Sequence, residues 1–123
     1  MKIAARQVAA LSRPPADSFD ARAAEFLVRS YPELGLADDV RLRRFVGHGH
    51  ERALQHGFTS ERDIVQYLLV MMQLGPKFDE DPQYPALRPF LDPASTMQPQ
   101  WRLNVLLAAA ARAPAPGERH AVR

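Results

Sequence analysis

Three histidines lie close together in the stretch GHGHERALQHG, and histidine is the commonest metal ligand among the side chains. On a helix, His48 and His50 would lie about 200° apart around the axis, and His56 would lie about 12 Å along the axis from His48. No pair has the i, i+4 spacing with which two helical histidines hold one zinc ion. The spacing therefore favours exposed helix histidines over a metal site, unless Gly47 and Gly49 break the helix.

A small group of carboxylates follows later in the chain, at Asp79, Glu80 and Asp81. Hard cations prefer such oxygen ligands, but a calcium-binding EF-hand needs a longer ordered set with a central glycine and a terminal glutamate. The neighbouring Phe78 and Tyr84 indicate instead a loop whose aromatic rings plug the core while its carboxylates stay solvated. We expect no metal site here.

General acid–base catalysis needs two acids that converge in a pocket. Glu25, Glu51 and Asp63 qualify only because helices are expected around them, and nearby arginines favour surface ion pairs. Ser60 has only His56 as a conceivable relay, and helix capping accounts for this serine fully. The chain contains no GxGxxG, GK[ST] or HExxH motif. The sequence therefore predicts no catalytic residue, no cofactor and no enzyme.

A helix, a Gly-Phe-Thr-Ser turn and a second helix are also the pattern of a DNA-binding helix-turn-helix. The second helix must then offer polar side chains to the bases, whereas IVQYLLVMMQL is apolar and is expected in the core. A DNA-binding regulator remains the alternative function, and it requires an exposed basic face and strongly salt-dependent binding. The cations of that face would be Arg41, Arg43, Arg44 and Arg52.

Apolar residues at helical spacing, separated by glycine and proline stops, predict an all-α chain. The expected helices are a first at about 3–11, a second from a cap at Asp17 or Ser18 to the residue before Pro32, a third from Asp38 or Asp39 to the residue before Gly57, a fourth at 61–74 and a last one at 100–112, with one helical turn at 86–91. Small residues near the end of the third helix would allow a close helix approach, and the stretch 45–81 predicts an antiparallel helical hairpin. The helix at 61–74 is apolar on many sides and is expected at the centre. We expect a compact bundle of four to five helices with a Pro-rich loop, forming one domain over 1–112, and a disordered tail over 113–123.

The bulk composition is that of an ordinary soluble domain. Its 123 residues include no cysteine, and 16 cations against 14 anions give a formal charge of +2. This near balance is not the footprint of a nucleic-acid-binding surface. The N-terminus is too polar for a signal peptide, and no apolar run is long enough to cross a membrane. We expect a cytoplasmic protein with no nucleic-acid or membrane partner.

Several pieces in a fixed order resemble a known family. They are the opening MKIAARQVAAL, the helix end RSYPEL, the RAL-HGFTSERDIVQYLLVMM block and the GPKFDEDPQYP loop, continued loosely through WRLNVLL. Together they resemble a family of small bacterial helical proteins associated with type VI secretion effector clusters. The resemblance implies an accessory role, as adaptor, chaperone or immunity partner of a secreted toxin or its spike, and it implies no catalytic residues.

The leading interpretation is a non-enzymatic protein-interaction module whose partner is a secreted effector or a component of the secretion spike. Aromatic and acidic side chains on a proline-stiffened loop would give contacts at a low ordering cost, and the same loop could instead be a lid over the core. A third interpretation, a small hydrolase or metal protein, requires the histidines at 48 and 50 or the aspartates of the loop to converge on one pocket. The candidate contact residues are Phe78, Asp79, Asp81, Tyr84 and Phe90.

Overall fold

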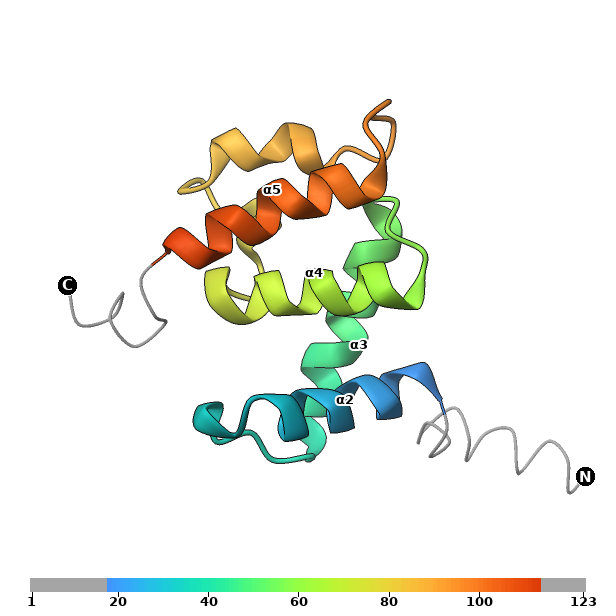
Figure 1. Cartoon of the computed structure of the whole chain (residues 1–123), viewed down its shortest axis with the longest axis vertical. Helices are drawn as coiled ribbons and strands as arrows, with labels where there is room; N and C mark the ends of the chain where they lie inside the picture. The colour runs from blue at the N-terminus through green and yellow to red at the C-terminus, as the bar shows by residue number, and fades with distance from the viewer. Residues whose placement is uncertain (1–17, 114–123) are drawn as a thin grey trace, which may run out of the picture. The chain divides into compact units, whose positions relative to one another are not determined.

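The computed structural model describes residues 18–113, and within that range the chain is all-α, as predicted (Figure 1). No strand occurs among these residues, and none of their helices is long and apolar enough to span a bilayer. The helix expected at 3–11 and, apart from Ala113, the tail expected at 113–123 lie outside the described residues. The elements are α2 (Phe19–Ser30), the 3₁₀-helix η1 (Pro32–Leu34), α3 (Val40–Gln55), α4 (Glu61–Leu74), the 3₁₀-helices η2 (Phe78–Glu80) and η3 (Pro85–Leu91), and α5 (Pro99–Arg112).

The chain divides into two compact units, and the division falls inside α3, between Gly47 and His48. The first unit contains α2, η1 and the first half of α3. The second contains the rest of α3, α4, the two later 3₁₀-helices and α5. The expectation of one domain over 1–112 stays a prediction.

Short polar side chains and glycines set the helix ends where the sequence predicts them. Ser18, Asp39 and Ser60 each accept a hydrogen bond from the backbone N–H three residues further on, at 3.2, 3.0 and 3.0 Å. These bonds satisfy N–H groups that have no partner within the helix. After α3 and α4 the backbone turns at Gly57 (φ 88°) and Gly75 (φ 112°), in a region that glycine adopts without steric cost. The elements are therefore delimited by local chemistry.

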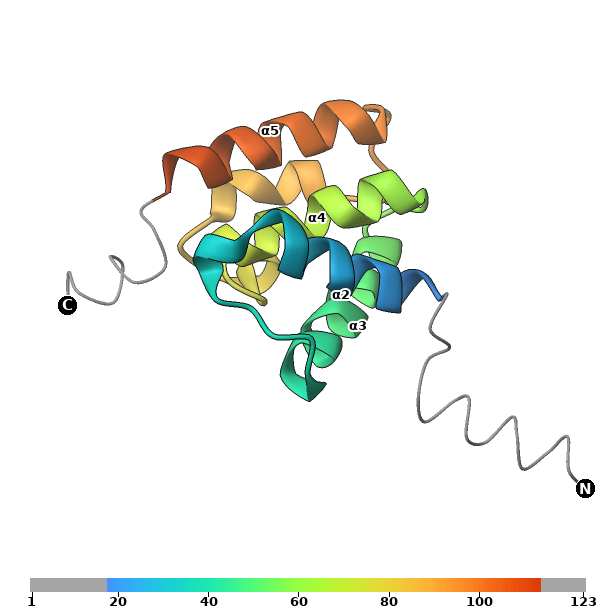
Figure 2. The same ribbon diagram turned by 60° about the horizontal axis from the view of Figure 1, so that its bottom comes forward.

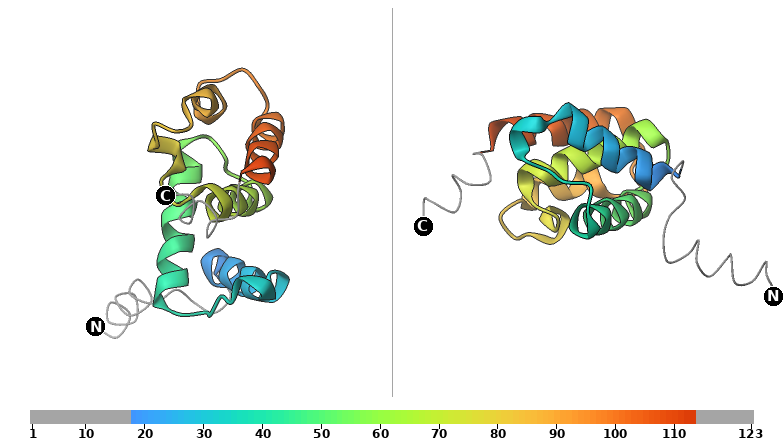
Figure 3. Two further views of the ribbon diagram at one scale, coloured as in Figure 1. Left: turned by 90° about the vertical axis from the view of Figure 1, so that its left-hand side faces the viewer. Right: turned by 90° about the horizontal axis from the view of Figure 1, so that it is seen from below.

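In the second unit α4 and α5 lie side by side and run in the same direction (Figure 1). The chain returns from the end of one to the start of the other through residues 75–98, here called the return segment. Its 3₁₀-helix η3 packs beside α5 and runs the opposite way (Figure 2). In the left view of Figure 3, α4, η3 and α5 are all seen close to end-on. Within the second unit α4, η3 and α5 are thus nearly aligned.

The antiparallel hairpin expected for 45–81 is wrong, because α3 crosses α4 steeply. The left view of Figure 3 shows α3 along its length where α4 is seen close to end-on. The crossing point is Gly49, where an added Cβ would lie 2.8 Å from Met71 Sδ and still closer to Leu68 Cδ2. The predicted close approach at a small residue is therefore confirmed. A crossing needs such contact at one point only, whereas a hairpin would need it along both helices.

The core of the second unit is built around α4. Three aromatic rings in this core lie in a row, with the Tyr67 ring in the middle. The Tyr67 ring centroid lies 5.9 Å from that of Phe58 and 5.4 Å from that of Phe78, both tilted. Burial of each large apolar side chain contributes about 1.5–3 kcal/mol to folding. The placement of α4 at the centre is as predicted, and its buried residues are Ile64, Tyr67, Leu68, Val70, Met71 and Leu74.

Candidate functional site

The most concentrated polar chemistry in the described residues surrounds the carboxylate of Asp79, on η2. Its side chain has no exposed surface. Oδ2 accepts hydrogen bonds from Arg52 Nε at 2.7 Å, from His56 Nε2 at 2.8 Å and from Tyr67 OH at 3.3 Å. Arg52 and His56 lie one turn apart on α3 and its end, whereas Tyr67 comes from α4. We call these four residues the Asp79 cluster, and it joins three elements that are distant in the sequence.

The charges in the cluster are set by burial and by the neighbouring donors. Burial raises the pKa of Asp79, but hydrogen bonds from His56 and Arg52, with their charges, outweigh it and hold that pKa below its usual range. Burial raises the pKa of Tyr67, and the negative charge of Asp79 raises it further. The hydrogen bond to Asp79 raises the pKa of Arg52. Near neutral pH the cluster therefore contains a carboxylate, a guanidinium and an un-ionised phenol.

Both ring nitrogens of His56 face oxygens that only accept hydrogen bonds. Nε2 lies 2.8 Å from Asp79 Oδ2, and Nδ1 lies 2.8 Å from the carbonyl oxygen of Leu91 at the end of η3. Only the doubly protonated imidazolium donates to both. Neither nitrogen is then available to remove a proton from another molecule, which is what a general base must do. In this geometry the cluster is a clamp between elements.

The other oxygen of Asp79, Oδ1, is buried and has no hydrogen-bond partner. A buried acceptor without a partner costs about 1–3 kcal/mol. The three donors of the cluster crowd onto Oδ2, so the carboxylate is held from one side only. The clamp therefore orients Asp79 through that single oxygen.

A second buried cation, Arg102 on α5, lies next to this cluster. Its Nη1 donates to the carbonyl oxygens of His56 at 2.8 Å, Phe90 at 3.4 Å and Asp92 at 3.3 Å. Its guanidinium carbon lies 4.5 Å above the centre of the Phe58 ring. Burial lowers the pKa of Arg102. Since a cation is favoured at the carbonyl end of a helix, Arg102 stabilises the ends of both α3 and η3.

The sequence interpretation missed both arrangements. The spacing of Arg52 and His56 places them on one helix face, which was a readable signal. Their partner Asp79 lies 23 residues after His56 in the chain, and nothing in the local pattern connects them. Nothing in the sequence marks Arg102, because an arginine in an amphipathic helix is ordinarily exposed.

The candidate contact residues of the return segment separate into two groups. Phe78 is buried in the core, as the lid interpretation requires, but Asp79 is buried with it, so the expectation of a solvated carboxylate there is wrong. Asp81 is half-buried and accepts a bond from the backbone N–H of Gln83 at 2.8 Å. Tyr84 and Phe90 are half-buried. Phe78 and Asp79 therefore offer no surface to a partner in this conformation, and a contact through the other three stays a prediction.

The three histidines do not assemble a metal site. The helix α3 continues through Gly47 and Gly49, so His48 and His50 keep their separation around the axis. Both are half-buried, not exposed as expected. No group of three or more His, Cys, Asp or Glu side chains that could hold a metal ion occurs within 18–113.

Of the four arginines expected on a DNA-facing surface, two form ion pairs within the protein and two are exposed. Arg43 donates to Asp38 at 2.7 and 3.0 Å, and Arg52 belongs to the Asp79 cluster. Arg41 and Arg44 are exposed. Since α4 buries its apolar side chains in the core, this geometry lends no support to a recognition helix there.

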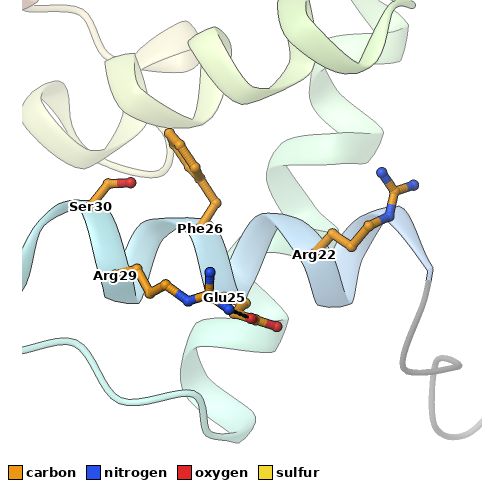
Figure 4. Close-up of a pocket in the computed structure, with 5 residues that line it drawn as sticks. All are labelled: Arg22, Glu25, Phe26, Arg29 and Ser30. Carbon is orange, nitrogen blue, oxygen red and sulfur yellow. Dashed lines mark hydrogen bonds and ion pairs between the residues drawn. The ribbon is translucent and has the colours of Figure 1, made fainter.

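A shallow groove of about 250 Å³ lies along α2 in the first unit (Figure 4). Phe26 lies in it, and Arg29 pairs with Glu25 across one helical turn. The ion pair neutralises most of the charge that the groove could offer to a ligand. Its lining residues are Arg22, Glu25, Phe26, Arg29 and Ser30.

Two large apolar side chains are exposed near the start of α5 in the second unit. Trp101 is 63% exposed and Met97 is 39% exposed. Large apolar side chains on a surface mark interaction sites when they gather together, and tryptophan is among the residues that most often dominate binding energy.

Comparison of the chain with protein-family models, with curated proteins and with solved structures finds no match. The resemblance to the type VI secretion family stays a prediction.

Proposed function

We propose that this chain is a non-enzymatic protein-interaction module that acts in the cytoplasm as an accessory of a type VI secretion effector. The observation that carries the proposal is the exposure of Trp101 in the first turn of α5. The partner that we propose, a secreted effector or a component of the secretion spike, is the one that the resemblance to the type VI secretion family implies. Adaptor, chaperone and immunity roles remain the forms that this accessory could take.

Trp101 is suited to anchoring a partner because its backbone is held firmly. The next residue, Arg102, is buried and bonded to three carbonyl oxygens. A side chain with only two rotatable bonds on a fixed helix loses little entropy when it binds. Burial of an exposed indole against a partner would then contribute directly to affinity.

The experiment is affinity capture from the native host at two salt concentrations, with the tagged wild type, Trp101→Ala and the control Val40→Ala. Val40 is as exposed as Trp101 but lies in the first unit. We expect a secreted effector or spike protein to be retained by the wild type and by the control at both salt concentrations, and to be lost from Trp101→Ala. Equal retention by Trp101→Ala would contradict the proposed surface.

Two further readouts distinguish the alternatives. Recovery of nucleic acid that disappears at the higher salt concentration would replace the proposal with the DNA-binding alternative. With an identified partner, emission from Trp101, which is the only tryptophan, should shift to shorter wavelength on binding because the indole leaves water. Toxin neutralisation in a co-expression assay would then separate an immunity protein from a chaperone.

A further inference from the structure

His56 connects both 3₁₀-helices of the return segment to the end of α3. Its Nε2 reaches Asp79 on η2 and its Nδ1 reaches the carbonyl oxygen of Leu91 at the end of η3, both at 2.8 Å. The ring is largely buried, with 13% of the side chain exposed. A single imidazole therefore bridges three elements, and it does so through acceptors alone.

A neutral imidazole carries one N–H, whereas the imidazolium carries two. A neutral ring would therefore point a lone pair at one of its two oxygens and lose that hydrogen bond. We propose that His56 is a pH-operated latch, whose imidazolium holds the return segment against the end of α3 and whose deprotonation releases the end of η3.

The contact that breaks can be identified from the strength of the two bonds. A hydrogen bond to a carboxylate is stronger than one to a neutral carbonyl, so the remaining proton stays on Nε2 and continues to bind Asp79. The bond to Leu91 is the one lost. Arg102 still donates to Phe90 and Asp92, so the release loosens η3 without detaching the return segment.

Charged and titratable groups surround the ring from every neighbouring element. Burial raises the pKa of Asp79 but the bonds from His56 and Arg52 more than reverse this, so the carboxylate is already an acceptor when the ring loses its proton. The surrounding groups are Arg52 on α3, Tyr67 on α4, Asp79 and Glu80 on η2, Asp92 after η3 and Arg102 on α5.

The test follows the ring and the segment in the same sample. The ¹⁵N shifts of the His56 ring report its protonation from pH 5 to 9. Amide exchange at Leu87, whose N–H bonds the Tyr84 carbonyl oxygen at 3.1 Å, reports the integrity of η3. The variants are His56→Gln, which removes the latch, and His50→Gln, which removes another half-buried histidine of α3.

We expect the protection of the Leu87 amide, corrected for the intrinsic effect of pH, to fall roughly tenfold as the ring loses its proton. The pH at which the His56 ring is half protonated should coincide with the midpoint of the change in Leu87 protection. His50→Gln should behave as the wild type, and His56→Gln should show no transition. A ring that loses its proton with unchanged Leu87 protection overturns the latch, and so does a ring that is already neutral at pH 5. If His56→Gln does not fold, the two wild-type titrations decide the question alone.

Discussion

Trp101 and Arg102 are neighbours on α5, and the apolar side chain faces water while the charged one is buried. Trp101 is 63% exposed and Arg102 is 2% exposed. The position of each residue around the helix axis explains the difference in exposure. Leu103 and Leu106 lie on the buried face of α5, and Arg102 lies on the same face. The carbonyl oxygens at the ends of α3 and η3 provide the acceptors that make burial of the guanidinium tolerable. One helix thus presents a rigid aromatic side chain outward and fixes two other elements inward.

Arg102→Met should destabilise the protein by about 2–4 kcal/mol, since it leaves buried carbonyl oxygens without a donor. Urea unfolding followed by circular dichroism measures this loss. Arg112→Met, at an exposed position near the end of the same helix, is the control and should change the free energy of unfolding by less than about 0.5 kcal/mol. Equal effects of the two substitutions would show that Arg102 has no special role.

Asp79→Asn should also be strongly destabilising, by about 3 kcal/mol, because it leaves Arg52 and His56 beside a neutral group in a buried site. Glu80→Gln is the matched control. Its carboxylate is exposed and lies 3.9 Å from the same arginine, and such surface pairs contribute about 0–1 kcal/mol. Urea unfolding of the two variants and the wild type measures both losses, as the shift of each variant's unfolding midpoint from that of the wild type. If Glu80→Gln destabilised the protein as much as Asp79→Asn, the stabilising partner of Arg52 would be the exposed carboxylate of Glu80 and not the buried one of Asp79.

Local chemistry could be predicted from the sequence, and long-range chemistry could not. The caps at Ser18 and Ser60 and the stops at Gly57 and Gly75 depend on residues within one turn, and they lie where expected. The carbonyl oxygen that Arg102 binds on His56 is 46 residues away in the chain, so no periodicity could reveal it. The buried Asp79 was misassigned for the same reason, because its partners come from other elements.

The acid stability of the protein should depend on Asp79 with a defined sign. Its pKa is lower in the folded state, because the bonds from His56 and Arg52 outweigh the effect of burial. An unfolded aspartate has a pKa of about 3.9, so the carboxylate contributes its full stabilisation above that value. The contribution is lost as the pH falls from about 4 through the folded pKa.

The difference in unfolding free energy between the wild type and Asp79→Asn should therefore be constant near pH 5 and shrink towards pH 2.5. Urea titrations of both proteins across this range measure it, and the other carboxylates cancel in the difference. A difference that grows on acidification would mean that the folded pKa of Asp79 is raised.

Gly47 and Gly49 lie on α3 two residues apart, and alanine at these positions should have opposite effects. An added Cβ at Gly47 meets only Asp20 Oδ2, at 3.9 Å, which is an ordinary contact. Gly47→Ala should therefore gain up to about 1 kcal/mol from the higher helix propensity of alanine. At Gly49 the Cβ would collide with the buried ends of Leu68 and Met71 where α3 crosses α4.

Overpacking of this kind costs about 1–3 kcal/mol, which exceeds the gain in propensity, so Gly49→Ala should be the less stable variant. Thermal unfolding of the two variants beside the wild type measures both signs at once. If both alanines were stabilising, the two helices could separate without cost, and Gly49 would not be required for their crossing.

Gly49→Ala combined with Leu68→Ala should recover part of the loss due to the collision, because the second substitution removes the methyl group that the new Cβ meets. Comparison with Leu68→Ala alone, which leaves a cavity that costs about 2–5 kcal/mol, isolates that coupling between α3 and α4.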